Sequence, residues 1–328
     1  NNMWSFYLLT PDRTALARLT FQQLKVINPE TGDRFFEAFG TGMPVNQISQ
    51  PFERFHDYEQ LLDMLHYDDA AKYKKLHKGT AFFFLGWAAF DMRNYTKAVF
   101  YLDNAISEDK RNFPTKWEGM EGANALKLFL NVNSSIHRVV KMLYETIKRE
   151  IIRFNKDTGS SLTIEDFVSK FVMTLLKGNR NKSTRSIITA LYTFIFEYED
   201  RLKELKLRSG RGGSMEPILS HLFKGGLIFE SLLKKLYPGP NNIGGFNSNP
   251  IFTADFCRVS VSAQTLKVIL NGISNYDLKT AFDTTAKLRN TSGHNLVWDD
   301  IFDKPSNYEK LYHQVVNAVL FIVVKKYQ

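Results

Sequence analysis

The chain has 328 residues, of which 44% are hydrophobic and 27 are phenylalanine, so it is long enough to bury a sizeable core in one large or two ordinary domains. Its formal net charge of +9 favours an anionic partner, with nucleic acid ahead of a membrane surface; the alternative is a charge that only keeps the surface soluble. The single cysteine, Cys257, excludes an internal disulfide and fits a reducing, cytoplasmic setting. No Cys-x-x-Cys or His-x-His pair indicates a zinc site, so we expect neither a metal nor another cofactor.

Residues 1–57 mix polar stretches with proline and glycine and give no firm element, whereas the pattern becomes helical from about residue 58. Residues 77–109 form two amphipathic segments joined at 92–95. The small and apolar residues of this hairpin resemble a single tetratricopeptide unit: Leu85, Gly86, Tyr95, Ala98, Leu102 and Ala105. No matching unit lies about 34 residues before or after it, and a solenoid needs about three. We therefore expect a helical hairpin packed on other helices, in a domain that docks a protein partner or senses a signal.

Apolar side chains spaced three and four residues apart predict further long helices over 114–155, 163–176 and 186–208. Two strongly apolar runs, 81–90 and 315–324, are about half the length of a membrane span. We expect both runs to be buried core helices, and we expect no membrane partner.

The segment SGRGGS, residues 209–214, is the clearest linker and predicts a boundary between a helical domain over 58–208 and a C-terminal bundle over 209–328. A helix beginning near Ser214 is stopped by the Pro-Gly-Pro at 238–240. Three more helices are expected over 261–273, 276–292 and about 307–326. Strand signals are few throughout, so the predicted fold class is all-α.

The end of the helix at 276–292 carries side chains suited to phosphate chemistry. Gly293 is well placed as the left-handed residue that ends this helix. The break allows His294 to converge on Arg289, which an unbroken helix would hold about 140° away. Asn290 follows the arginine directly. An Arg-x4-His spacing is expected by chance in about one chain in three of this composition, and requiring asparagine after the arginine lowers the chance to about one in forty.

The run Arg289-Asn290-Thr291-Ser292-Gly293-His294 resembles the signature of the HEPN family. That signature is an arginine, a polar residue that is often asparagine, three to five more residues and a histidine, at the end of an interior helix. HEPN domains are bundles of four to five helices found in prokaryotic defence systems and eukaryotic RNA-processing enzymes. The helix that begins near Ser214 also resembles the long first helix of these domains. The resemblance covers residues 214–328, about a third of the chain.

The resemblance implies a metal-independent RNA endonuclease in which the ribose 2′-hydroxyl attacks the adjacent phosphate and leaves a 2′,3′-cyclic phosphate end. His294 would transfer protons, because an unperturbed imidazole has a pKa of about 6.5. Arg289 would hold phosphate oxygens, and Asn290 would position the phosphate or the histidine. In the family two such motifs meet across a dimer. We therefore expect RNA as the partner, a homodimer through the C-terminal bundle, and a role as a toxin or effector of a prokaryotic defence system.

Glu230 interrupts the apolar face of the helix that begins near Ser214. Burying a carboxylate is costly unless it is paired, so we expect Arg289 or His294 as its partner. The pair either supports the site or is a core ion pair with no catalytic part. Basic residues of the loop 177–185 and of the segment around the linker are weaker candidates for RNA contacts, and plain solvated loops are an equal alternative for them: Lys177, Arg180, Lys182, Arg185, Arg208 and Arg211.

Two other functions stay open at this point. One is a non-catalytic HEPN-fold scaffold that binds RNA or protein, since an arginine and a histidine at a helix end also satisfy free carbonyls. The other is a tetratricopeptide-like adaptor whose C-terminal bundle serves only to dimerise. The intact set of Arg289, Asn290 and His294 favours the ribonuclease, and the lack of further repeats weighs against the adaptor.

Overall fold

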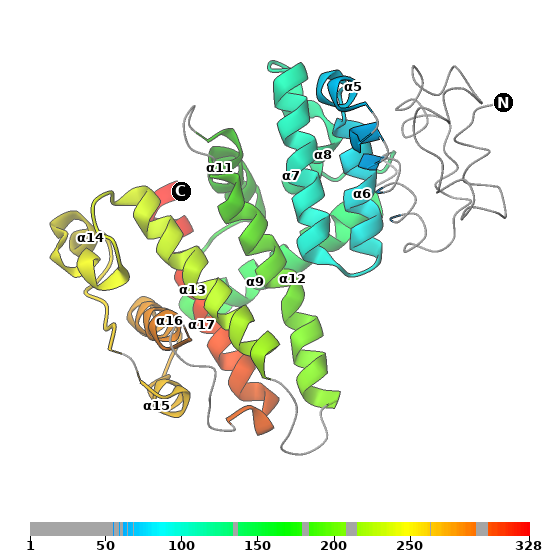
Figure 1. Ribbon diagram of the computed structural model, residues 1–328. Coiled ribbons are helices and arrows are strands. Elements are labelled where there is room, and N and C mark those ends of the chain that lie inside the picture. Colours follow the sequence, from blue (N-terminus) through cyan, green and yellow to red (C-terminus); the bar gives the residue numbers. More distant parts are fainter. Residues whose placement is uncertain are drawn as a thin grey trace. The chain divides into compact units, whose positions relative to one another are not determined.

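The computed structural model describes residues 55, 59, 62, 63, 65–67, 69–133, 137–178, 184–207, 215–262, 264–292 and 301–328. Every regular element within these residues is a helix (Figure 1), which confirms the predicted all-α fold. The mixed segment predicted for 1–57 lies, apart from Phe55, outside the described residues.

In chain order the helices, with η marking the short 3₁₀ and π segments, are α5 (Ala70–Lys75), α6 (Gly79–Asp91), α7 (Tyr95–Asn112), η3 (Trp117–Gly119), α8 (Glu121–Leu126), α9 (His137–Thr158), α10 (Ile164–Asp166), η4 (Phe167–Val172), α11 (Met173–Lys177), α12 (Arg185–Leu207), α13 (Glu216–Leu236), η5 (Ile243–Ser248), α14 (Pro250–Asp255), α15 (Leu266–Asn271), α16 (Leu278–Ser292), η6 (Ile301–Asp303) and α17 (Pro305–Tyr327).

Two compact units make up the chain, Asn1–Lys141 and Met142–Gln328. This division falls inside α9, well before the linker at 209–214 that the sequence suggested as a boundary. The physical reason is that α12, which precedes the linker, packs against α13 and α17. The ring of Phe194 on α12 stacks on His221 of α13 with centroids 4.4 Å apart. Helix α12 therefore shares one core with the C-terminal helices.

In the first unit, α6 and α7 form the hairpin that the sequence indicated over 77–109 (Figure 1). Asn94 begins α7, because its side-chain oxygen accepts a hydrogen bond from the Lys97 N–H at 3.1 Å. A Cβ added at Gly86 would lie 3.0 Å from Leu102 Cγ. The absence of a side chain at Gly86 therefore allows the two helices to approach closely.

In the second unit, α13 packs against α12, α16 and α17 (Figure 1). Gly225 permits this, since a Cβ there would lie 2.5 Å from Val315 Cγ1 on α17 and 2.8 Å from the Phe194 ring on α12. Helix α17 is buried along most of its length, so the apolar run at 315–324 is core, as predicted. None of the described helices combines the length and the apolar character that a bilayer crossing requires.

Candidate functional site

Helix α16, which carries the candidate motif, begins two residues later than predicted and reaches the predicted end at Ser292. Its first turn is capped by Asp277, whose carboxylate accepts from the Thr280 N–H at 2.7 Å. One face of α16 is fully buried at four positions: Ala281, Phe282, Thr285 and Leu288. Arg289 therefore lies at the edge of a buried face, where its stem can pack and its head group can reach the surface.

The stem of Arg289 packs directly on the backbone of α13. A Cβ added at Gly226 would lie 2.6 Å from Arg289 Cβ and 3.1 Å from its Cα. Any larger residue at position 226 would push the two helices apart. The glycine thus sets the distance between α13 and α16 at the site, and it leaves the arginine side chain running toward Glu230, one helical turn further along α13.

Glu230 and Arg289 form the ion pair that a buried carboxylate requires. Arg289 Nε donates to Glu230 Oε2 at 2.5 Å, and the glutamate side chain is only 3% exposed. The other oxygen, Oε1, lies 2.7 Å from Lys234 Nζ, an ionic contact outside hydrogen-bond geometry. Two cations therefore offset the cost of burying one carboxylate. The arginine side chain is 27% exposed, so the pair sits at the boundary between core and solvent.

The guanidinium group of Arg289 is held in a fixed orientation by two of its three nitrogens. Its Nε is engaged by Glu230, and its Nη1 donates a long hydrogen bond of 3.4 Å to Asn290 Oδ1. Within the part of the chain that the structure describes, Nη2 has no hydrogen bond. A guanidinium fixed at one edge by a buried carboxylate leaves its other nitrogen ready to donate to an anion without losing much conformational entropy.

The end of α16 is also tied to the chain segment before α15. Asn290 Nδ2 donates to the Val261 carbonyl at 2.8 Å. Thr291 Oγ1 donates to the Gln264 carbonyl at 3.0 Å and accepts from the Gln264 N–H at 3.2 Å. These bonds involve Val261 and Gln264, which are not helical, and α15 begins at Leu266 although a helix was predicted from residue 261. Asn290 thus positions Arg289 and the backbone, with its amide N–H₂ occupied by the protein itself.

The remaining predicted site residues are placed less completely. His294 and Gly293 lie outside the described residues, and so do Arg180, Lys182, Arg208 and Arg211. Lys177 is the last residue of α11 and Arg185 the first of α12. The structure therefore brings together Arg289, Asn290 and Glu230 and leaves the position of the predicted proton-transfer group undescribed.

Sequence reasoning missed two contributors to this site. Lys234 follows Glu230 by four residues, a spacing that places both on one helix face and that could have been noticed. Gly226 carries no such signal, because a glycine inside an apolar helix does not reveal which side chain approaches it from another helix. Only the packing of α13 on α16 identifies its role.

Among the other histidines, His221 is a satisfied core residue. Its Nε2 and the Phe194 carbonyl are 2.7 Å apart, and its Nδ1 and the Tyr308 hydroxyl are 2.9 Å apart. Burial lowers the pKa of His221 to about 3, so the ring stays neutral near pH 7. It braces α12, α13 and α17 and has no room for a substrate.

Searches for related proteins do not add an identity: no protein-family model, no curated protein and no solved structure matches the chain. Among the described residues, no group of three or more His, Cys, Asp and Glu side chains is arranged to hold a metal ion. The function of the chain is therefore inferred from the geometry around Arg289.

The Glu230–Arg289 pair is expected to show strong energetic coupling. Arg289→Met leaves the buried carboxylate with Lys234 alone, and Glu230→Gln leaves the cation without its charged partner. We expect each change to lower the free energy of unfolding by about 2 kcal/mol, with a coupling energy of about 1–3 kcal/mol in a double-mutant cycle followed by urea unfolding.

The matched control is the Arg149–Glu199 pair, in which both side chains are 61% exposed. Its coupling energy should stay below about 1 kcal/mol. Equal coupling in the two pairs would contradict the view that Glu230 is a buried anchor for the arginine.

Proposed function

We propose that the chain is a metal-independent RNA endonuclease of the HEPN type, with Arg289 binding the scissile phosphate and His294 transferring protons. The observation that carries this proposal is the buried Glu230–Arg289 ion pair, which holds the guanidinium at a helix end with Nη2 unengaged among the described residues. A pair that served only to satisfy a buried charge would not require the arginine side chain to be 27% exposed.

The proposed reaction is an internal transesterification. The 2′-oxygen of one ribose attacks the adjacent phosphorus while the bond to the 5′-oxygen of the next nucleotide breaks. A base removes the 2′-hydroxyl proton, and an acid gives a proton to the departing 5′-oxygen. The products are a 2′,3′-cyclic phosphate and a free 5′-hydroxyl. Arg289 Nη2 would donate to a non-bridging phosphate oxygen as charge builds up there.

Asn290 has a supporting role in this proposal. Its amide is bound to Val261 and its oxygen faces Arg289, so it stiffens the end of α16 where the phosphate would bind. A group fixed before the substrate arrives needs little reorganisation during the reaction. The resemblance also suggests a cytoplasmic toxin or effector of a prokaryotic defence system, with the first unit binding a regulator.

Assembly as a homodimer through the C-terminal bundle is part of the proposal. One His294 cannot stand on both sides of a phosphate, whereas a two-fold axis would supply a second copy. Two basic sites that face each other repel, so RNA should strengthen the pairing. Sedimentation velocity with 2′-O-methyl RNA, which lacks the attacking hydroxyl, should show a dimer that RNA stabilises. A strictly monomeric and fully active protein would refute this arrangement.

Cleavage of RNA by the purified protein is expected to continue in excess EDTA, because no step of the proposed reaction uses a metal ion. The measurement is the rate of cleavage of mixed RNA with and without the chelator. Loss of activity in EDTA that returns on adding magnesium would rule out the mechanism.

The second candidate is a non-catalytic scaffold that binds RNA or protein. The same hydrogen bonds also support this candidate. The side chain of Asn290 and two of the three guanidinium nitrogens of Arg289 bond to other parts of the protein, as expected if the end of α16 has only a structural role. Binding of RNA with no cleavage under any of these conditions would support it.

A further inference from the structure

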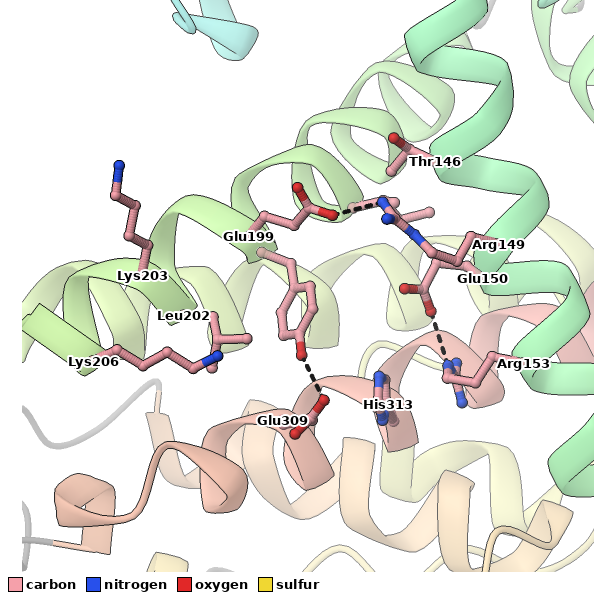
Figure 2. A pocket seen from close by; sticks show the side chains of 12 residues that line it. Thr146, Arg149, Glu150, Arg153, Glu199, Leu202, Lys203, Lys206, Glu309 and His313 are labelled. Carbon is pink, nitrogen blue, oxygen red and sulfur yellow. Dashed lines mark hydrogen bonds and ion pairs between the residues drawn. The ribbon is translucent and has the colours of Figure 1, made fainter.

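A cavity lies in the same unit as Arg289 and shares no residue with the site described above. It has a volume of about 620 Å³ and is walled by α9, α12 and α17 (Figure 2). This volume is within the usual range of small-molecule pockets, about 300–1,000 Å³. Inorganic phosphate alone would leave most of it filled with water.

The part of the cavity rim formed by α12 carries two lysines. Lys203 and Lys206 are exposed, stand three residues apart on one helix face, and make no ion pair or hydrogen bond in the described part of the chain. Across the cavity, Arg149 on α9 pairs with Glu199 at 2.6 Å, and both side chains are 61% exposed (Figure 2). A pair this exposed is weakly held, so its arginine can turn to a stronger anion.

The wall formed by α17 offers groups of a different kind. Glu309 accepts a hydrogen bond at Oε1 from the Tyr198 hydroxyl at 3.1 Å, and its second oxygen has no hydrogen bond among the described residues (Figure 2). Burial, together with the Glu309 charge, raises the pKa of Tyr198, so this hydroxyl remains a donor. This second oxygen of Glu309 would repel an anionic group of a ligand, and it would accept hydrogen bonds from ligand hydroxyls.

His313 is the most informative residue of the cavity. It is half-buried beside Tyr198 and Tyr312, and neither ring nitrogen has a hydrogen bond among the described residues. Burial, with a smaller effect of the Arg153 charge, lowers the pKa of His313 to about 3, so the ring is neutral near pH 7. A neutral imidazole presents one donor and one acceptor, a combination that matches a ligand hydroxyl.

Apolar side chains complete the lining, with Leu202 on α12 among them (Figure 2). The cavity thus offers cations at the rim, hydroxyl-binding groups on α17 and an apolar surface between them. We propose that it binds a ribonucleoside monophosphate, with the phosphate on Lys203 and Lys206, the ribose hydroxyls on Glu309 and His313, and the base against the apolar surface. This site is independent of the ribonuclease proposal, because its occupancy can be measured whether or not the chain cleaves RNA.

The test is isothermal titration calorimetry of the full chain with AMP, and with adenosine and inorganic phosphate as its two parts. AMP is expected to bind more tightly than either part. The double variant Lys203→Glu/Lys206→Glu should weaken AMP binding by about tenfold or more. Lys156→Glu is the matched control and should leave AMP binding unchanged, since Lys156 is an exposed lysine of α9 outside the cavity with no partner among the described residues.

A second variant separates ligand recognition from charge. His313→Phe keeps an aromatic ring and removes both nitrogens, so it should weaken binding of AMP and adenosine but leave that of phosphate unchanged. Thermal unfolding of each variant verifies that the fold is retained. The lysine variants should keep the fold, because Lys203, Lys206 and Lys156 are exposed. The proposal is overturned if AMP does not bind at millimolar concentration, if phosphate alone binds as tightly as AMP, or if Lys156→Glu has the same effect as the double variant.

Discussion

Replacing His294 with alanine is expected to abolish RNA turnover while leaving most RNA affinity intact. Proton transfer by a positioned side chain contributes about 10²–10⁴-fold to a rate, so the cleavage rate should fall by at least this factor. Affinity should change little, because the imidazole is proposed to act in proton transfer, whereas Arg289 is proposed to hold the phosphate.

The two quantities are separable by experiment. Single-turnover cleavage of a labelled RNA measures the chemical step, and fluorescence anisotropy with 2′-O-methyl RNA measures binding without cleavage. His66→Ala is a control for the loss of a histidine, since His66 is exposed and lies in the other unit, Asn1–Lys141. Full cleavage activity in His294→Ala would contradict the proposed ribonuclease mechanism and would favour the non-catalytic scaffold as the function of this site.

Replacing Arg289 is expected to damage both binding and turnover, and lysine should not rescue it. The arginine uses Nε for Glu230 and would use Nη2 for phosphate. A lysine has one nitrogen on a flexible stem and cannot hold both partners with the same geometry. We expect Arg289→Lys and Arg289→Ala to lower the cleavage rate by about 10²–10³-fold, as removal of one fixed donor to a developing negative charge does.

The control for Arg289 is Lys234→Ala, which removes the other cation near Glu230. Lys234 is 43% exposed and contacts only the far oxygen of the carboxylate, so its loss should have a much smaller effect on cleavage. A wild-type rate in Arg289→Lys would show that a point charge is enough and that the oriented guanidinium is not used.

Local patterns were sufficient to predict most of the C-terminal helices. The helix expected over 276–292 corresponds to α16, and the lone carboxylate in an apolar face of α13 identified Glu230 as a group that needs a partner. Both inferences follow from the cost of exposing apolar surface or burying charge, which a single helix reveals through its periodicity.

Contacts between helices distant in the chain could not be predicted in this way. The sequence does not show that Gly226 meets Arg289, or that Asn290 bonds to Val261, where a helix was predicted to begin. The cavity containing His313 depends on three helices separated by long stretches of chain, and no spacing in the sequence relates them. The inclusion of α12 in the unit Met142–Gln328 likewise follows from how α12 packs, which the glycine-rich sequence of 209–214 does not reveal.

The chemical end left on cleaved RNA tests the central claim most directly. The wild-type protein should be incubated with a defined RNA in EDTA, beside His294→Ala, and the products analysed by mass spectrometry. We expect fragments ending in a 2′,3′-cyclic phosphate, paired with fragments that begin with a 5′-hydroxyl, from the wild-type protein and none from the variant. Fragments with a 3′-hydroxyl and a 5′-phosphate would mean that water, and not the 2′-hydroxyl, attacks the phosphorus, and would contradict the proposed mechanism.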